Sequence, residues 1–280
     1  EQISKVPLSG LFSFQEQGLH EFKKRKMLIP IGDDNRDRHL TPFVNYALII
    51  LNIIVFVFLQ NMGNDIHFTY AYSTVPGEIL TGRDIITNSQ ILVDPYTQQR
   101  FEMPGLQRTD IPVYLTLITS MFMHGGIAHI AGNMLFLWIF GDNLENDMGH
   151  FNYLIFYLLC GVIAGLTHVF TTAFFGHSLL IPSLGASGAI SGVMGGYILQ
   201  HPGRRVHVWF LLGIISVPAV IAVGLWFIFQ IINGMGGLGG EEAGGVAYAA
   251  HIGGFIAGFI LVKMFVRKKP VLVNKRKMFW

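Results

Sequence analysis

The sequence predicts an all-α, polytopic membrane protein with six membrane-spanning helices, of which the fourth is short and central. Apolar residues make up 51% of the 280 residues and charged residues 13%, and the mean hydropathy is +0.49. Charged side chains are absent from five long stretches, 43–61, 111–141, 148–203, 206–240 and 243–262. Such stretches are typical of segments embedded in lipid.

Each predicted span corresponds to one apolar run. The first begins at Thr41-Pro42, where a capping residue precedes a first-turn proline, and continues to about Gln60. An approach segment at 113–123 and a break at His124-Gly125-Gly126 precede the second span. A polar turn at 141–149 is expected to separate the second span from the third. In chain order the later spans are predicted at about 126–141, 151–171, 188–200, 208–232 with Pro218 inside it, and 246–265.

The fourth predicted span has a special position because of its length. Some 13 residues are too few to cross a bilayer unless protein surrounds the helix. We therefore expect this helix to be buried at the centre of the bundle. The polar stretch 62–112, rich in Pro and Gly, is too long for a simple connection and is expected to be partly structured.

The topology follows from the basic residues. Sixteen of the 19 Lys and Arg residues lie in residues 1–40, at Arg204-Arg205 and from Lys263 onward. By the positive-inside rule both termini are cytoplasmic, and the loops 62–112, 172–186 and 233–245 face outward. The predicted parts are a cytoplasmic N-terminal segment (1–40), a membrane domain (41–266) and a basic cytoplasmic tail (267–280). We expect an integral protein of a prokaryotic cytoplasmic (inner) membrane.

The net charge and the cysteine content limit the kinds of partner and of covalent cross-link that the chain can have. The net charge is +2, and the basic residues lie where topology requires them, so no nucleic-acid partner is expected. Cys160 is the single cysteine, which excludes an intrachain disulfide. The expected partners are the lipid bilayer and other membrane proteins.

Polar side chains at membrane depth are costly without partners, so the few that occur here are candidates for function. Four stand out, namely His129, Asn133, Ser187 and His251. Gly185-Ala-Ser-Gly188 follows a proline-containing segment and begins a helix, which places Ser187 where backbone amides have no intrahelical acceptor. Such amides can stabilise an oxyanion.

A histidine is available to activate this serine. His251, Gly254 and Gly258 share one face of the last span through i+3 and i+7 spacing. Gly188, Gly192 and Gly196 form a similar stripe in the fourth span, and small residues permit close helix contact. If the two stripes meet, His251 can serve as general base for Ser187 although 64 residues separate them.

His129 and Asn133 lie four residues apart on one face of the second span, and both can donate hydrogen bonds. With the Ser187 amide they could form an oxyanion hole. Interhelical hydrogen bonding and metal binding by a histidine cluster are the alternative interpretations of this pair.

These motifs together resemble the rhomboid intramembrane serine proteases. The resemblance covers about 41–266 and rests on Gly185-Ala-Ser-Gly188, His129-x-x-x-Asn133 and Ala250-His251 with Gly254-x-x-x-Gly258. It implies that Ser187 is the nucleophile and His251 the general base and acid. His129, Asn133 and the Ser187 amide would be the oxyanion donors, and Glu145 would help to anchor the first loop.

The resemblance implies a peptidase without a cofactor or metal that cleaves single-span or polytopic membrane protein substrates through an acyl-enzyme. Two departures concern the first loop, where Tyr114-Leu-Thr116 replaces a frequent Trp-Arg, and Ser191, which replaces an aromatic that stacks on the base. The alternatives are a pseudoprotease that binds membrane helices without cutting and a transporter with a histidine relay. An intramembrane zinc protease is a further alternative, with candidate ligands His124, His129, His168, His177 and His251.

Overall fold

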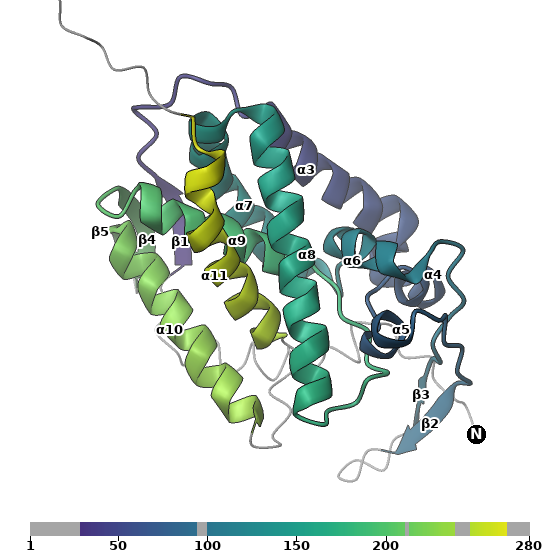
Figure 1. The fold of residues 1–280 in the computed structure, drawn as a ribbon. Helices are drawn as coiled ribbons and strands as arrows, with labels where there is room; N and C mark the ends of the chain where they lie inside the picture. The colour runs from purple at the N-terminus through teal and green to yellow at the C-terminus, as the bar shows by residue number, and fades with distance from the viewer. Residues whose placement is uncertain (1–28, 94–99, 211–212, 239–246, 268–280) are drawn as a thin grey trace, which may run out of the picture.

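The computed structural model describes residues 29–93, 100–210, 213–238 and 247–267, and Figure 1 shows their arrangement. The parts of the predicted segments that lie outside these residues are 1–28 of the N-terminal segment, 94–99 of the first outward loop, 211–212 of the fifth span, 239–245 of the last outward loop, 246 of the sixth span and 268–280 of the tail. The chain is predominantly helical. Its apolar helices are α3 (Phe43–Ile54), continued by a π-helical turn (Val55–Leu59), α7 (Ile127–Met148), α8 (His150–Phe174), α9 (Ser187–Gln200), α10 (Ala219–Leu238) and α11 (Tyr248–Phe265).

Membrane-spanning character varies among these helices. Within the described residues, α8 and α11 are each long and apolar enough to cross a bilayer. A third span forms if residues 113–122 and α7, which meet at an 83° bend, are counted together. Residues 43–59 and 219–235 form shorter apolar helices. Large apolar side chains such as Phe58, Ile228 and Met264 are exposed on their outer faces, as expected for contact with lipid.

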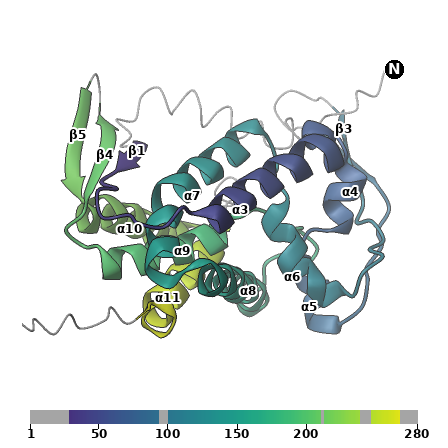
Figure 2. The ribbon, with the colours of Figure 1, turned by 90° about the horizontal axis from the view of Figure 1, so that it is seen from above.

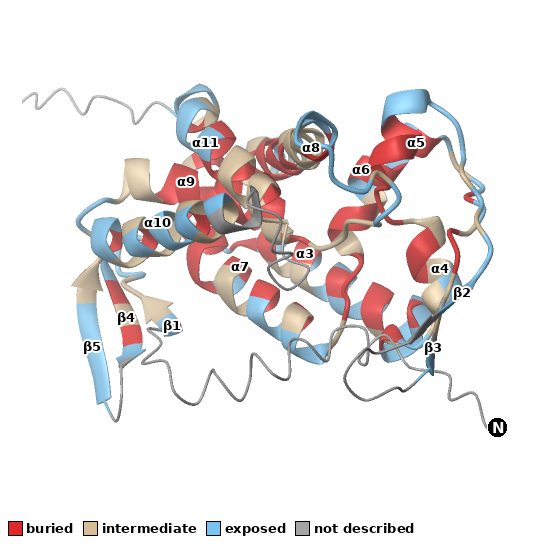
Figure 3. Cartoon of the chain, turned by 90° about the horizontal axis from the view of Figure 1, so that it is seen from below, coloured by how far each residue is buried: buried red, intermediate tan, exposed pale blue. Residues whose placement is uncertain are grey.

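Helix α9 lies between α7, α8, α10 and α11 (Figure 2). Every residue from Gly188 to Tyr197 is buried, and the buried positions of the neighbouring helices face it (Figure 3). Its glycines make this possible, since a Cβ at Gly192 would overlap Cys160 on α8 and a Cβ at Gly195 would overlap the backbone of Phe255 on α11. Large side chains of the core pack around the helix, among them Leu137 and Leu144 of α7 and Phe156 of α8.

The first loop contains short elements of its own. They are α4 (Ile66–Ala71), α5 (Pro76–Thr81), a hairpin of β2 (Gln90–Val93) and β3 (Arg100–Met103), and, before α7, a 3-10 turn (Val113–Leu115), α6 (Thr116–Thr119) and a second 3-10 turn (Ser120–Phe122). A backbone bridge between Thr74 and Ser183 ties the loop to the segment that precedes α9. The Thr74 hydroxyl also donates to the carbonyl of Thr116, and Thr119 donates to the carbonyl of Tyr72. Threonine hydroxyls and backbone groups therefore anchor this loop where Trp-Arg is absent.

The predicted fifth span at 208–232 is wrong in its first half. Strands β4 (Arg205–Phe210) and β5 (Gly213–Pro218) form an antiparallel hairpin, and β1 (Ile29–Asp33) pairs with β4. In β4, Val206 and Val208 are buried whereas Trp209 is exposed, which is the alternation of a strand with one covered face, and β5 is mostly exposed. Pro218 does not lie inside a helix, because it ends β5 and α10 begins directly after it.

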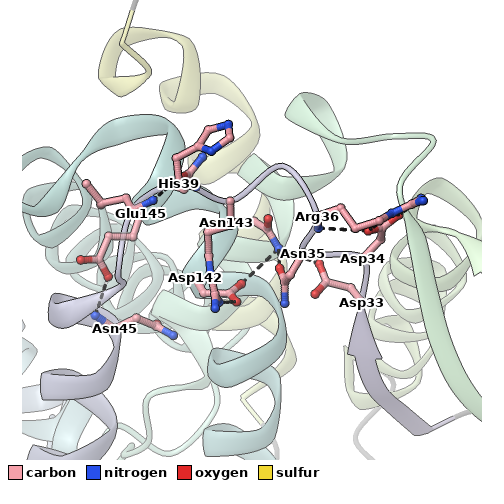
Figure 4. A network of polar contacts seen from close by, with 12 residues as sticks. Asp33, Asp34, Asn35, Arg36, His39, Asn45, Asp142, Asn143 and Glu145 are labelled. Carbon is pink, nitrogen blue, oxygen red and sulfur yellow. Dashed lines mark hydrogen bonds and ion pairs between the residues drawn. The ribbon is translucent and has the colours of Figure 1, made fainter.

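The predicted polar turn at 141–149 is also wrong, because α7 continues to Met148 and ends at Gly149. The polar residues at this end of α7 stay helical because their side chains pair with the segment that precedes α3 (Figure 4). Arg38 contacts Asp142, the Asn143 amide donates to Asp33 and Asn35, and Asn146 accepts from the backbone of His39 and Leu40. Residues 33–40 thus pack against this end of the bundle.

Glu145 belongs to the same region. Its carboxylate accepts the backbone N–H groups of Val44 at 2.9 Å and Asn45 at 2.7 Å, and it lies 2.5 Å from His150 Nδ1. The prediction that Glu145 anchors the first loop is therefore wrong, because it instead satisfies the free N–H groups of the first turn of α3. An anion is also favoured there by the helix dipole.

Asp33 provides a pH-dependent prediction for this packing. Burial, opposed in part by hydrogen bonding from Tyr197 at 2.5 Å, raises the pKa of Asp33 from its ordinary value to about 6. Because the folded protein then binds the proton more tightly than the unfolded chain, stability declines as the pH rises through about 6. We expect the thermal midpoint of wild type relative to Asp33→Asn to fall between about pH 4.5 and about pH 7 in detergent micelles.

Asp34→Asn is the matched control. Hydrogen bonds from Arg36 lower the pKa of Asp34 to about 2, so this neighbouring carboxylate keeps its charge over that interval. The difference in thermal midpoint between wild type and Asp34→Asn should therefore not change with pH. If the midpoint of wild type relative to Asp33→Asn also stayed constant, or rose with pH, the raised pKa of Asp33 would be contradicted.

Candidate functional site

Ser187 is the first residue of α9, after the N-cap Ala186. Gly185, which comes directly before Ala186, has φ +121°, a backbone conformation that residues other than glycine rarely adopt. The Gly185 N–H donates to the carbonyl of Ser120. The amides of the first helical turn have no acceptor within the helix. This local geometry therefore places a hydroxyl beside unused backbone N–H groups.

His251 lies in the first turn of α11, and its Nε2 is 2.7 Å from Ser187 Oγ. The two side chains meet because the backbones of α9 and α11 nearly touch. A Cβ at Gly254 would overlap the carbonyl of Gly188, and a Cβ at Gly258 would overlap the carbonyl of Gly192. The glycine stripes thus pack against each other as the sequence predicted.

The other ring nitrogen of His251 also has a partner. Nδ1 lies 2.8 Å from Oε1 of Gln230 on α10, and the ring of Trp226 is 6.1 Å from the imidazole. Ser191 does not contact the base, because its hydroxyl donates to the carbonyl of Ser187. Sequence reasoning missed Gln230, although an amide inside the charge-free stretch 206–240 is itself a polar group at membrane depth.

His129 approaches the serine from α7. Its Nδ1 accepts the Gly125 N–H at 3.3 Å, which leaves Nε2 as the ring nitrogen that carries a proton. A Cβ placed at Gly185 would lie 2.9 Å from His129 Nε2 and 3.7 Å from Ser187 Oγ. The imidazole N–H and the serine hydroxyl therefore border the same small space, which the absence of a side chain at Gly185 keeps open.

Asn133 lies one helical turn beyond His129. Its side chain is 8% exposed, and Nδ2 has no hydrogen-bond partner among the described residues. A buried donor without a partner is costly, so such a group calls for an explanation. A negatively charged oxygen that forms on a substrate during a reaction would be an acceptor for the Asn133 Nδ2–H.

The turn before α7 is fixed by a second residue that sequence reasoning missed. Gln60, buried at the end of the first apolar helix, accepts the His124 N–H and donates to the His124 carbonyl. This pair of hydrogen bonds holds the chain just before Gly125-Gly126, where α7 starts. A buried amide at the end of a span was the available signal.

The remaining predicted residues fall into two places. Gly185, Gly188, Gly254 and Gly258 all lie beside Ser187 or in the contact of α9 with α11. Glu145 does not lie near the site, because it follows His129 by 16 residues on one helix, roughly 24 Å along its axis. Among the described residues no three His, Cys, Asp or Glu side chains are grouped closely enough to hold a metal ion.

Comparison with known proteins agrees with this architecture. The Rhomboid domain family matches residues 112–268. Over 174 residues the chain is 29% identical to "Rhomboid protein 1, mitochondrial" of Saccharomyces cerevisiae, covering 62% of this chain and 48% of that protein. It is 30% identical over 160 residues to "Rhomboid protease GluP" of Bacillus subtilis, covering 57% and 28%, and 28% identical over 162 residues to "Rhomboid-like protein 11, chloroplastic" of Arabidopsis thaliana, covering 55% and 53%.

The chain belongs to the rhomboid family and is an integral membrane protein. It spans about half the length or less of the curated relatives described above. Members of the family include proteins named as proteases, such as that of Bacillus subtilis.

The contact between α9 and α11 generates a prediction. Gly254→Leu places a side chain against the Gly188 carbonyl, next to Ser187, and should move His251 away from Ser187 Oγ. We expect the free energy of unfolding to fall by about 1–3 kcal/mol, as for overpacked cores, together with loss of the reactivity that His251 can give the Ser187 hydroxyl. Unfolding in detergent and labelling by a serine-directed fluorophosphonate probe measure the two effects.

Gly132→Leu is the control for this substitution. Gly132 is exposed on α7, and a Cβ there meets nothing within 4 Å. This variant should keep wild-type stability and activity. A stable and active Gly254→Leu protein would show that the α9–α11 contact does not hold the two side chains together.

Proposed function

We propose that the chain is an intramembrane serine endopeptidase that cleaves a peptide bond in or near a transmembrane helix of a membrane protein. The observation that carries this proposal is the 2.7 Å separation of Ser187 Oγ and His251 Nε2. A serine hydroxyl is a weak nucleophile, and an imidazole within hydrogen-bond reach is the usual means of activating it. The membership of the family supports the same activity.

The reaction follows from the residues present. Ser187 Oγ attacks the carbonyl carbon of the substrate while its proton passes to His251 Nε2. The carbonyl oxygen becomes an oxyanion, for which the Ser187 N–H, the His129 Nε2–H and the Asn133 Nδ2–H are the proposed donors. His251 then returns the proton to the leaving amine, and an ester remains on Ser187.

Deacylation repeats these steps with water. His251 removes a proton from the water as it attacks the ester, and the proton returns to Ser187 Oγ when the ester bond breaks. The products are a free carboxylate and the regenerated hydroxyl. In these steps Ser187 and His251 carry out the proton transfers, and His129, Asn133 and the Ser187 N–H stabilise the oxyanion.

The proposed topology has six spans, formed by residues 43–59, α7, α8, α9, α10 and α11, with the short α9 enclosed by the others. Both termini face the cytoplasm in this proposal. Two contacts at one end of the bundle support it, since the Arg267 N–H donates to the Asp147 carbonyl and the His39 N–H donates to Asn146. The N-terminal segment (1–40), the membrane domain (41–266) and the tail (267–280) stay predictions.

The membrane itself is a separate question. The matched relatives include a protein of Bacillus subtilis and proteins named as mitochondrial or chloroplastic, and they give no support to a prokaryotic cytoplasmic membrane over an organellar one. We therefore propose single-span or polytopic membrane proteins as substrates without assigning the compartment.

A serine-directed fluorophosphonate probe tests the proposal. Ser187→Ala and His251→Ala should each abolish labelling, and each should lower turnover of a membrane-embedded reporter by at least about 10³-fold, because each removes a chemical role. Asn133→Ala should be milder, since it removes one oxyanion donor worth about 10²-fold to 10³-fold in turnover. Labelling is measured by in-gel fluorescence and turnover by mass spectrometry of the product.

Ser73→Ala is the matched control, because Ser73 is a buried serine whose hydroxyl donates to the Thr69 carbonyl in the first loop. It should label and turn over as wild type does. Wild-type turnover by Ser187→Ala would refute the peptidase mechanism and favour a helix-binding or transport protein. Loss of activity in a metal chelator would instead favour the zinc alternative.

A further inference from the structure

The imidazole of His251 is held from two sides by two different helices. Ser187 on α9 lies at Nε2, and Gln230 on α10 lies at Nδ1. The Gln230 side chain is 6% exposed, although it belongs to a helix whose outer face carries exposed apolar side chains such as Ile228 and Phe229. A buried amide that contacts a histidine at 2.8 Å within this helix has a specific role to explain.

The identity of the contacting atom constrains the tautomer. Oε1 of Gln230 is a carboxamide oxygen, which can only accept a hydrogen bond. His251 Nδ1 must therefore carry the proton, and in a neutral imidazole Nε2 then has a free lone pair. That lone pair faces Ser187 Oγ, which is the arrangement needed to remove the hydroxyl proton. The opposite tautomer would present an N–H to Ser187 and could not act as a base.

The position of Gln230 is fixed by aromatic packing on the same face of α10. Phe227 stacks on Phe255 of α11 with ring centroids 4.0 Å apart, and Trp226 lies against both His251 and Phe255. Trp226 and Gln230 are one turn apart and so share a face. These contacts hold α10 beside the first turns of α11 and direct the amide to Nδ1.

We propose that Gln230 is a positioning residue that keeps His251 in the tautomer and orientation required to deprotonate Ser187. This inference rests on the proposed peptidase function. In soluble serine proteases a buried aspartate does this work. An amide supplies the same acceptor without placing a second charge in the membrane, where a charged side chain is expensive. When His251 becomes positively charged during turnover, the Nδ1–H stays paired with Oε1.

A purely structural role for Gln230 makes a different prediction. Interhelical hydrogen bonds between polar side chains can join membrane helices without any part in chemistry. If Gln230 only joined α10 to α11, its removal would lower thermal stability, and turnover would fall only as far as the protein unfolds. The experiment therefore has to separate turnover and tautomer from stability.

Gln230→Met is the decisive variant, because it keeps an unbranched side chain of similar size and removes the acceptor. We expect kcat to fall by about 10-fold to 10³-fold, less than the roughly 10⁴-fold loss on replacing the charged orienting residue of a triad. KM should stay within about twofold, because the interaction does not contribute to substrate binding in the ground state. Gln230→Glu, which can offer an acceptor oxygen to Nδ1 in either protonation state, should retain turnover within about tenfold of wild type.

Asn233→Leu is the matched control on the same helix. Asn233 is a partly buried amide that donates to the Phe229 carbonyl within α10, and its loss should leave kcat and KM unchanged. The tautomer is read independently of activity from the ¹⁵N shifts of the ring nitrogens in histidine-labelled protein, with His251 assigned by comparison with His251→Ala. Wild type should show the Nδ1–H form, and Gln230→Met should show a mixture of both forms.

Four outcomes would overturn the inference. They are an Nε2–H tautomer in wild type, wild-type kcat in Gln230→Met, a loss of turnover in Gln230→Met that only parallels its unfolding, and a Gln230→Glu protein as inactive as Gln230→Met. If Gln230→Met does not fold, the ¹⁵N spectrum of wild type still tests the inference, because it shows whether Nδ1 or Nε2 of His251 carries the proton. An active Ser187→Ala protein would refute the peptidase itself, whereas an inactive Ser187→Ala with a fully active Gln230→Met would refute only the role of Gln230.

Discussion

The close backbone approach of α9 and α11 is the constraint on which the candidate site depends. Gly254 and Gly258 lie against the carbonyls of Gly188 and Gly192, so even one added methyl group would force the helices apart. Because lipid supplies no hydrophobic drive for helices to associate, contact of this kind relies on close van der Waals packing. The same contact sets the distance between Ser187 and His251, so packing and chemistry share one interface.

Polar groups inside the bundle follow a second physical rule. Most buried amides and hydroxyls are paired, as shown by Asn45 with Leu137 and Tyr153, and by Gln60 with His124. Asn133 Nδ2 departs from the rule within the described residues, and it lies one turn from His129. Other buried polar atoms without a partner, such as Asn52 Oδ1 and the Tyr157 hydroxyl, lie elsewhere in the described bundle, so the proximity of Asn133 to His129 and not its lack of a partner alone links it to the site.

Much of the bundle could be predicted from the sequence, because lipid imposes long charge-free stretches that are local and easy to recognise. The residues at which the helices start and end were harder to predict. Residues 206–210 and 213–218 belong to a stretch as apolar as a span, yet they form strands because β1, more than 170 residues earlier in the chain, supplies the pairing edge for β4. Residues 142–148 are polar enough for a turn, yet they remain helical because Arg38, Asp33 and the start of α3 satisfy their side chains.

The sequence by itself determined which chemical groups are present and which helices carry them: a serine at a helix start, a histidine on a glycine stripe, and a donor pair at i, i+4. These features depend on neighbours within one or two turns, so local spacing is enough to find them. Tertiary structure alone decided that Gln230 meets His251, that Glu145 caps α3, and that threonine hydroxyls anchor the first loop. Each of these contacts joins residues from different elements, and local periodicity carries no information about which helix faces will meet.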